Sequence, residues 1–288
     1  MRLRDLVVLA RPKHWVKNAF VLMPVPFAVA AGAALRPWSF LMGLAAMGMA
    51  ASAVYALNDV LDAEQDRLHP EKKLRPVASG RVSVAAALAW GAALLAGGLA
   101  LAWAAAGFPA LAVIGTYAAL NVGYCLGGKN LPLLDVFLLA SGFVLRVVLG
   151  TVLVSAVPSN WLLLCSSSLA LFLGLAKRRG DLVKGLGEDH RPSLEGYNLV
   201  FLDQAMGITG AITLIGYALY TLEAEILVDG REFTTLPFVV FGVLEYLRLA
   251  QVKGKGGSPV DVILSSPVIA ACGIGWVLAA LWSVPLLP

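Results

Sequence analysis

Nine apolar segments, each about as long as a bilayer is thick, constrain the fold of this chain more than any other feature. A helix needs about 20 consecutive apolar residues to cross the hydrocarbon core of a membrane. In a chain that is 59% hydrophobic and only 14% charged, such segments cover 15–35, 38–60, 83–106, 108–126, 132–155, 159–179, 199–222, 233–251 and 261–286. We therefore predict an all-α membrane protein, with a single domain over residues 1–288.

The distribution of positive charge predicts how these segments are oriented. If the N-terminus is cytoplasmic, the cytoplasmic side holds all but three of the 22 lysine and arginine residues. Of those three, Arg36 and Arg231 lie on the opposite side and Arg146 lies within a segment. Because positive charge gathers on the cytoplasmic side, we predict a multi-pass protein of the inner (plasma) membrane with its C-terminus outside. The two long polar loops, 61–82 and 177–198, then both face the cytoplasm.

A short internal similarity suggests a duplication. RPVASG (75–80) lies in the first long loop, and RPSLEG (191–196) lies in the second. Each follows a span that ends in a charged cluster. This pattern is compatible with a repeated four-helix unit that comprises spans one to four and spans five to eight.

The most charged stretch of the chain, NDVLDAEQDRLHPEKKLRPVASG (58–80), follows the second apolar segment. Within it, Asp59, Asp62 and Asp66 are spaced by three and then four residues, so they share one face if the segment continues as a helix. Asn58 lies beside them. Three neighbouring carboxylates repel one another, and Mg²⁺ would compensate them because it takes oxygen ligands and bridges carboxylates to substrate phosphates. We therefore predict that these three aspartates bind Mg²⁺.

A purely structural explanation of the same stretch stays open. It would be a solvated helix end whose aspartates pair with the cations that follow, namely Arg67, Lys72, Lys73 and Arg75. The residues after the aspartates favour a site instead, because His69-Pro70 ends the helix and KKLRP then brings a basic loop close to the carboxylates. Carboxylates for a metal beside cations for phosphate oxygens are what a diphosphate site requires.

At NDVLDAEQD (58–66) the chain resembles the UbiA superfamily of intramembrane prenyltransferases, whose first aspartate-rich motif is N-D-x-x-D-x-x-x-D. RPKHWVKN, DRLHPEKKLRPVASG, KNLPLLDVFLLASGFVLRVVLG and LAKRRGDL also resemble one branch, the decaprenyl-phosphate phosphoribosyltransferases. The resemblance implies nine transmembrane helices around a central cavity open to the cytoplasm. It also implies that Asp59, Asp62 and Asp66 are catalytic and hold Mg²⁺ on the diphosphate of the donor.

The branch implies a reaction. 5-Phosphoribose passes from phosphoribosyl diphosphate to a decaprenyl-like polyprenyl phosphate and pyrophosphate leaves, in the synthesis of cell-envelope glycolipid precursors. Lys72 or Arg75 would assist the departing pyrophosphate, while Lys177, Arg178 or Arg146 would position the acceptor. The acceptor phosphate is already anionic and needs no general base. The full set of expected substrate contacts is Lys17, Asn58, Lys72, Arg75, Lys129, Arg146, Lys177, Arg178, Asp181 and Tyr197.

One departure from the superfamily pattern bears on the substrates. Aromatic prenyltransferases of the superfamily usually carry a second aspartate-rich motif after the sixth span. The corresponding stretch here is KRRGD (177–181), which has three cations and one carboxylate. A site with more fixed positive charge suits substrates that bring several phosphate groups, as phosphoribosyl diphosphate and a lipid phosphate do.

Single residues leave a choice between substrate contacts and structure. Arg146 lies inside the fifth segment, where a charge is costly unless it is paired or hydrated. Gly142 and Gly150, four residues to either side, leave its face open. Arg146 therefore either pairs with a carboxylate of another helix or binds a phosphate. Three further residues are either substrate contacts or membrane anchors: Lys17, Lys129 and Tyr197.

Two other functions compete with the phosphoribosyl transfer. An aromatic prenyltransferase would use a prenyl diphosphate and a quinone or tetrapyrrole precursor. A carrier of anionic metabolites would use the same cations, but it gives no reason for three aspartates in helical register. We exclude nucleic acid as a partner, because the basic residues lie against the membrane and alternate with acidic ones. Membrane lipids are expected partners, and a homo-oligomer stays open.

Overall fold

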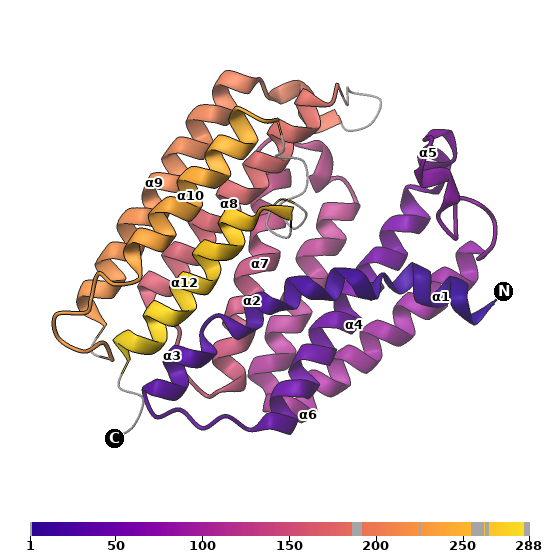
Figure 1. The fold of residues 1–288 in the computed structure, drawn as a ribbon. Helices are drawn as coiled ribbons and strands as arrows, with labels where there is room; N and C mark the ends of the chain where they lie inside the picture. The colour runs from indigo at the N-terminus through magenta and orange to yellow at the C-terminus, as the bar shows by residue number, and fades with distance from the viewer. Residues whose placement is uncertain (1, 186–191, 225, 255–261, 263–264, 285–288) are drawn as a thin grey trace. The chain divides into compact units, whose positions relative to one another are not determined.

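The structure is a computed structural model that describes residues 2–185, 192–224, 226–254, 262 and 265–284, and every regular element within this range is a helix (Figure 1). The chain divides into two compact units. The first unit comprises Met1–Val29, Ala33–Gly128 and Leu145–Val157, and the second comprises Ala30–Gly32, Lys129–Val144 and Pro158–Pro288. The single domain with an internal repeat stays a prediction. Arg191, the first residue of RPSLEG (191–196), lies outside the described residues.

The first unit is built on two long helices that run side by side, α4 (Pro37–Leu61) and α6 (Val84–Cys125) (Figure 1). Ser83 caps the start of α6 by accepting a hydrogen bond from the Ala86 N–H at 3.2 Å. The shorter elements of this unit are α1 (Leu3–Ala10), η1 (Pro12–Asn18), α2 (Ala19–Leu22), α3 (Val25–Ala30), α5 (Ala63–Leu68) and η2 (Lys72–Leu74).

Small residues let α4 and α6 approach each other closely. A Cβ atom added to Gly98 of α6 would lie 3.0 Å from the Ala46 carbonyl oxygen of α4. One added to Gly91 would lie 3.4 Å from the Ala53 carbonyl oxygen. Helices in a bilayer gain no hydrophobic stabilisation by leaving lipid, so close backbone contact through glycine and alanine is a common way for them to associate.

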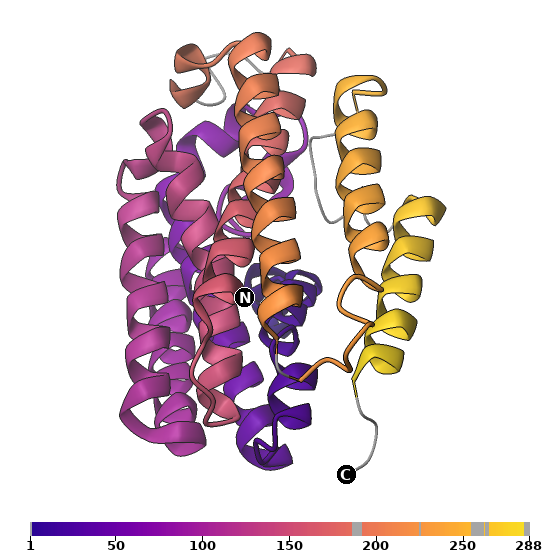
Figure 2. The same cartoon turned by 90° about the vertical axis from the view of Figure 1, so that its left-hand side faces the viewer.

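The second unit contains α8 (Asn160–Val183), α9 (Leu199–Glu223), α10 (Leu236–Gln251) and α12 (Pro267–Ser283), with the short elements η3 (Gly128–Asn130) and η4 (Pro192–Gly196). Helix α8 packs against α9, and α10 packs against α12, a pair that Figure 2 shows side by side. One of the boundaries between the units falls within α7 (Leu134–Leu153), between Val144 and Leu145.

The helices agree with most of the predicted apolar segments. Within the part of the chain that the structure describes, five helices are long and apolar enough to cross a membrane: α4, α6, α7, α8 and α9. Helix α6 has 42 residues and covers two predicted segments, which meet at a bend where Ala106 and Gly107 leave helical geometry and Gly107 has φ of +64°. Helix α12 is apolar but has only 17 residues. The all-α prediction is confirmed for the described residues, and the nine spans stay a prediction.

Two predicted boundaries were wrong. The first apolar segment, 15–35, is not one helix but the succession of η1, α2 and α3, because Pro24 and Pro26 interrupt regular hydrogen bonding. The second long loop was expected to start at residue 177, yet α8 continues to Val183. Residues 177–181 therefore lie on the last turns of a helix, where the spacing of side chains follows the helical repeat.

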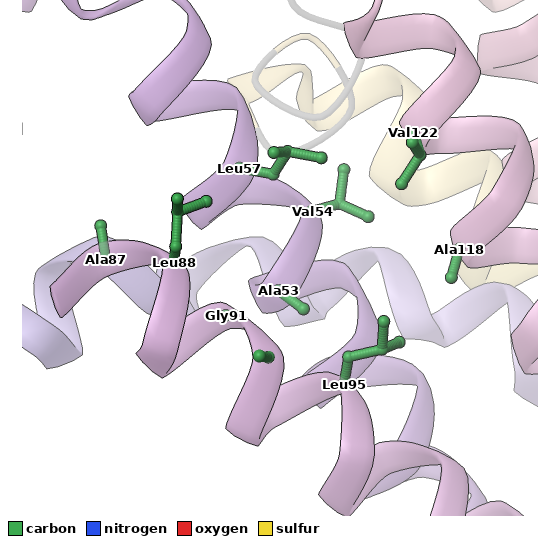
Figure 3. A pocket seen from close by; sticks show the side chains of 10 residues that line it. Ala53, Val54, Leu57, Ala87, Leu88, Gly91, Leu95, Ala118 and Val122 are labelled. Carbon is green, nitrogen blue, oxygen red and sulfur yellow. The ribbon is translucent and has the colours of Figure 1, made fainter. Parts of the chain in front are cut away.

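A small apolar cavity lies in the first unit beside the end of α4 (Figure 3). Its volume is about 160 Å³. The lining comes from α4 and from both arms of α6, and includes Val54, Leu57, Leu88, Leu95 and Val122. With no charged side chain in its lining, this cavity is not the place where a phosphorylated substrate would bind.

Candidate functional site

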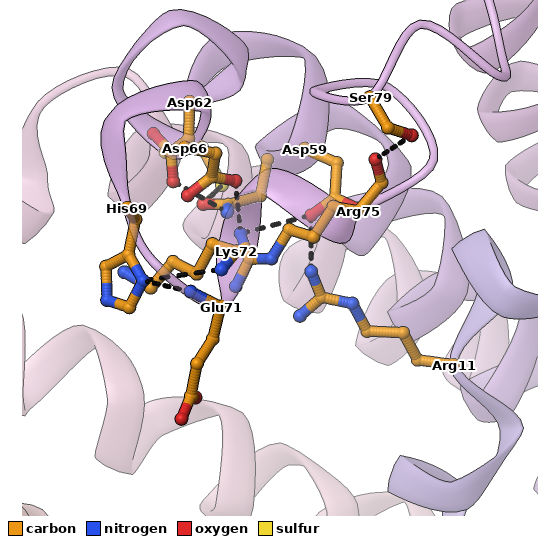
Figure 4. A network of polar contacts seen from close by, with 11 residues as sticks. Arg11, Asp59, Asp62, Asp66, His69, Glu71, Lys72, Arg75 and Ser79 are labelled. Carbon is orange, nitrogen blue, oxygen red and sulfur yellow. Dashed lines mark hydrogen bonds and ion pairs between the residues drawn. The ribbon is translucent and has the colours of Figure 1, made fainter.

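The three predicted aspartates lie where α4 gives way to α5 (Figure 4). Asp59 belongs to the last turn of α4, Asp62 is the residue between the two helices, and Asp66 belongs to α5. The Asp62 N–H donates to the Asn58 carbonyl at 2.9 Å, and the Asp66 N–H donates to the Asp62 carbonyl at 2.8 Å. The helical course thus continues through all three residues, as the spacing predicted.

Two arginines hold the carboxylates of Asp59 and Asp66 (Figure 4). Arg75 Nη1 lies 2.6 Å from Asp66 Oδ2 and 3.4 Å from Asp59 Oδ1. Arg11 Nη2 donates to the same Oδ1 of Asp59. The two carboxylates are buried, with only 2% and 3% of each residue exposed, whereas the arginine side chains keep 21% and 25% exposed. The two carboxylates are therefore buried, while the arginines that contact them remain partly accessible.

The basic loop after α5 is folded by its own hydrogen bonds. His69 Nδ1 accepts from the N–H groups of Glu71 and Lys72, at 3.2 and 3.3 Å, and so shapes the turn after the helix. Arg67 Nε donates to the Ala78 carbonyl at 3.2 Å. These contacts return the chain so that Arg75 faces the aspartates and Lys72 lies half-buried beside them (Figure 4). The predicted break at His69-Pro70 is confirmed, since α5 ends at Leu68.

The chemistry of this cluster fits a hard divalent cation. Oxygens of Asp59 and Asp66 converge on one cationic atom, Arg75 Nη1, so the geometry already brings two carboxylates to a shared positive charge. The third aspartate is turned to Asn58, whose Nδ2 donates to Asp62 Oδ2 at 2.8 Å. Among the described residues, no three His, Cys, Asp or Glu side chains form a ready-made metal cage. An all-oxygen set of two or three carboxylates suits Mg²⁺, which keeps several waters.

A second polar cluster of the first unit surrounds Arg146 of α7. The residue is only 4% exposed. Its Nε donates to Asn18 Oδ1 at 3.2 Å, its Nη2 donates to the Tyr117 hydroxyl at 3.2 Å, and the guanidinium lies 4.8 Å from the centre of the Tyr117 ring. The amide of Asn18 and the phenol of Tyr117 thus orient the guanidinium. Lys17 precedes Asn18 and is half-buried.

We expected Gly142 and Gly150 to leave the face of α7 beside Arg146 open, but at Gly150 this face is occupied. A Cβ atom added to Gly150 would lie 2.1 Å from the Val21 carbonyl oxygen and 2.8 Å from Pro24. The backbone of the broken first segment therefore occupies this place. Residues 19–24 can approach α7 this closely because Gly150 has no side chain.

In the second unit, Asp135 organises a buried network that includes two of the predicted contact residues. Arg178 Nε donates to Asp135 Oδ2 at 2.5 Å, Ser193 donates to the same oxygen at 3.0 Å, and the Tyr197 hydroxyl donates to Oδ1 at 2.7 Å. Both Arg178 and Asp135 are fully buried. Burial and the bond to Asp135 raise the pKa of the Tyr197 hydroxyl, so it stays protonated. Arg178 and Tyr197 thus join α7, α8 and the segment before α9.

The remaining predicted residues lie around the end of α8 and at η3. Arg178 Nη1 also donates to Asp181 at 3.2 Å, so the one carboxylate of the KRRGD stretch is engaged within its own helix. Arg179 pairs with Asp203 at 2.6 Å and donates to the Ala250 carbonyl at 2.6 Å. Lys177 and Lys129 are half-buried, on α8 and in η3 respectively.

Sequence reasoning missed the contacts that join distant parts of the chain. Arg11 contacts Asp59 across 48 residues of sequence, and Asp135 contacts Arg178 across 43. Neither spacing follows a helical period, so no local pattern could reveal the pairs. The one signal for Arg11 in the sequence is its place in RPKHWVKN, a stretch of the family resemblance.

Comparison with protein-family models places residues 19–188 in the UbiA prenyltransferase family. Among curated proteins, the decaprenyl-phosphate phosphoribosyltransferase of Corynebacterium glutamicum is 34% identical over 286 residues, which cover 96% of this chain and 86% of that protein. The protein of the same name from Mycobacterium tuberculosis is 31% identical over 277 residues, covering 93% of this chain and 90% of that protein.

Solved structures show the same fold. A UbiA homolog from Archaeoglobus fulgidus, bound to GPP and Mg²⁺, superposes with a TM-score of 0.71 at 22% sequence identity. The match covers 96% of this chain and 97% of that one. At this level of identity the comparison bears on the arrangement of the helices alone.

Proposed function

The chain belongs to the UbiA prenyltransferase family, and on this basis we propose that it transfers 5-phosphoribose from phosphoribosyl diphosphate to a polyprenyl phosphate, releasing pyrophosphate. The observation that carries the proposal is the extent of the similarity. Proteins named decaprenyl-phosphate phosphoribosyltransferase match over 93% or more of this chain, and the family match at residues 19–188 includes Asp59, Asp66 and Arg75.

The aspartate cluster is the proposed place of the donor's diphosphate. Asp59 and Asp66, with Asp62 and Asn58 beside them, would hold Mg²⁺, which when bound supplies positive charge to the diphosphate oxygens. Arg75 and Lys72 come from the loop that faces the aspartates and would donate hydrogen bonds to the leaving pyrophosphate. The Arg75 guanidinium and the Lys72 ammonium would stabilise the charge that develops on the pyrophosphate as its bond to C1 of the ribose breaks.

The cluster around Arg146 is the proposed place of a phosphate monoester, either that of the lipid acceptor or the 5-phosphate of the donor. Asn18 and Tyr117 fix the guanidinium, and Lys17 adds a second cation nearby in sequence. An oxygen of the acceptor phosphate forms the new bond to C1 while the C1–pyrophosphate bond breaks. The acceptor is anionic at neutral pH, so the residues need only position it and balance its charge. Lys177 and Lys129 remain proposed contacts, whereas we assign Arg178, Asp181 and Tyr197 a positioning role.

The arrangement in the membrane follows from the same proposal. We place nine spans around a cavity open to the cytoplasm, with the N-terminus inside and the C-terminus outside the inner membrane. The charge distribution supports this orientation, since all but three of the lysine and arginine residues then lie on the cytoplasmic side. A water-soluble donor reaches the site from the cytoplasm, and the lipid chain of the acceptor stays in the bilayer.

The end of α8 argues against an ordinary aromatic prenyltransferase. That rival needs a second acidic motif to clamp a prenyl diphosphate. Here the only carboxylate of residues 177–181 is Asp181, and Arg178 already donates to it. The one carboxylate of this stretch is therefore held in an ion pair within its own helix and does not form a second acidic motif.

A turnover assay tests the proposed function. Purified protein in detergent receives Mg²⁺, radiolabelled phosphoribosyl diphosphate and a polyprenyl phosphate, and label is measured in the lipid phase. Asp59→Asn should lower the rate by about 10³-fold, because it removes a charge that acts on the departing pyrophosphate. Asp5→Asn is the matched control, since Asp5 is a carboxylate of the same unit that pairs with Arg81 and should leave the rate unchanged. Activity from a prenyl diphosphate and an aromatic acceptor, without label transfer, would instead support the rival.

A further inference from the structure

Arg11 has a backbone conformation that an L-residue rarely adopts. It follows α1 with φ of 50° and ψ of 55°, the left-handed region, and it is followed directly by Pro12. For a residue other than glycine this conformation costs about 1–2 kcal/mol. Such outliers persist only where neighbouring contacts hold them, and they concentrate at functional sites.

Contacts with α4 hold the corner on both sides of Arg11. Ser52 of α4 donates from Oγ to the Ala10 carbonyl at 2.7 Å, and it accepts a hydrogen bond from Trp15 Nε1 at 3.0 Å. One buried hydroxyl thus fixes the residue before Arg11 and a side chain four residues after it. The corner sends the Arg11 side chain along α4, with its guanidinium 5.1 Å from the centre of the Tyr55 ring and in contact with Asp59.

Arg11 contacts a carboxylate that Arg75 also approaches, at a longer distance. Asp59 Oδ1 receives Arg11 Nη2 and also lies 3.4 Å from Arg75 Nη1, which has its shorter contact, 2.6 Å, with Asp66. Arg75 therefore belongs mainly to Asp66, and Arg11 is the main partner of Asp59. With 21% of its side chain exposed, Arg11 has room to leave this carboxylate, whereas Asp59 is buried and cannot follow it.

We propose that Arg11 is an exchangeable counter-cation of the donor site. It neutralises Asp59 while the site is empty, and it moves its hydrogen bonds to a phosphate oxygen when the metal and the diphosphate bind together. The inference rests on the proposed function, because it assumes a diphosphate beside Asp59. A metal ion and a guanidinium compete for one carboxylate oxygen and repel each other, whereas the diphosphate brings the negative charge that accommodates both.

This exchange predicts opposite effects on two ligands. Without Arg11, a divalent cation alone should bind more tightly, because its competitor at Asp59 is gone. The diphosphate should bind less tightly, because it loses a hydrogen-bonding cation. A purely structural Arg11 would change both affinities in the same direction or neither.

Arg11→Gly is the informative variant. Glycine adopts positive φ without strain, so the corner between α1 and η1 is retained while the guanidinium is removed. We would measure Mn²⁺ binding by electron paramagnetic resonance and pyrophosphate binding by calorimetry at saturating Mn²⁺, both on the purified full chain without turnover. For Arg11→Gly we expect about tenfold tighter Mn²⁺ binding and about tenfold weaker pyrophosphate binding. Arg11→Lys, which keeps the charge, should lie between this variant and the wild type in both measurements.

Arg81→Gln is the matched control. Arg81 also ties α1 to the basic loop, through Asp5 at 3.0 Å and the Leu74 carbonyl at 2.7 Å, but its described contacts do not involve Asp59. Both affinities should stay within about twofold of the wild type for this variant. If Arg11→Gly binds Mn²⁺ no more tightly than the wild type, or pyrophosphate no more weakly, the exchange is refuted. If the wild type itself binds no pyrophosphate, the proposed function fails together with this inference. If the wild type binds pyrophosphate and Arg11→Gly does not change the affinities as expected, the exchange alone fails.

Discussion

The two units each contain a cluster of carboxylates and guanidinium groups, and the clusters differ in exposure more than in chemistry. In the first unit, Arg11 and Arg75 keep 21% and 25% of their side chains exposed as they hold Asp59 and Asp66. In the second unit, Arg178 and Asp135 have no exposed side-chain surface. An ion pair whose cation stays accessible can exchange that cation for a ligand. A fully sealed pair cannot, and breaking it leaves a buried charge uncompensated.

This comparison separates residues that a sequence motif presents as equals. Arg75 and Arg178 both lie in basic stretches of the family resemblance, and both were expected to contact phosphate. The structure gives them different surroundings, so we expect substitutions in the first cluster to affect the reaction and substitutions in the second to affect stability.

Asp135→Asn should show the largest effect on stability. Removing one partner of a buried ion pair costs about 3–5 kcal/mol, since Arg178 then keeps a buried charge with one carboxylate fewer. The melting temperature of the purified protein in detergent, followed by size-exclusion chromatography of heated samples, measures this loss. Asp59→Asn serves as the comparison and should melt close to the wild type. If Asp135→Asn keeps its melting temperature but loses label transfer, the sealed cluster takes part in the reaction.

Arg146→Gln should show a smaller effect, confined to substrate binding. Glutamine keeps a hydrogen-bonding side chain for Asn18 and Tyr117 but removes the charge that we assign to a phosphate monoester. The KM of one substrate should rise about 10- to 100-fold, in line with about 1.5–3 kcal/mol for a hydrogen bond to a charged group. Varying donor and acceptor separately identifies which phosphate is bound. Equal, small changes for both substrates would show that Arg146 only supports the fold.

Tyr197→Phe should show the smallest effect. The variant loses the hydroxyl that donates to Asp135 and accepts from the Leu133 N–H at 2.6 Å, which is worth about 1 kcal/mol of stability. Because the pKa of Tyr197 is raised, its contribution is fully present below the usual value near 10 and is lost only as the pH rises through the raised value. The difference in melting temperature between wild type and variant should therefore stay constant from pH 6 to 9. A difference that changes across this range would show that the hydroxyl titrates earlier.

Local patterns in the sequence predicted the local parts of the structure. The spacing of Asp59, Asp62 and Asp66 placed them on one continuing helical course, and His69-Pro70 marked where that course stops. Both features depend on residues within one or two turns of each other. The apolar segments likewise located most helices, because hydrophobicity and length are properties of each segment by itself.

Pairings between distant residues could not be predicted in this way. The KRRGD stretch predicts a group of cations. Which of them forms a buried ion pair depends on Asp135, which belongs to another helix. The strained corner at Arg11 depends on Ser52, and the broken first segment is matched by Gly150 of α7. In each case the deciding partner is brought near by the fold, and no spacing along the chain encodes it.

The close pairing of α4 and α6 has a consequence for how the protein is made. The two helices are consecutive, and only residues 62–83 separate them, so their association requires no long loop to close. Every residue of the cluster formed by Arg11, Asp59, Asp66 and Arg75 precedes α6 in the chain. Chains fold progressively from the N-terminus during synthesis. We therefore expect the donor site to be assembled in the membrane while the ribosome is still translating the second unit.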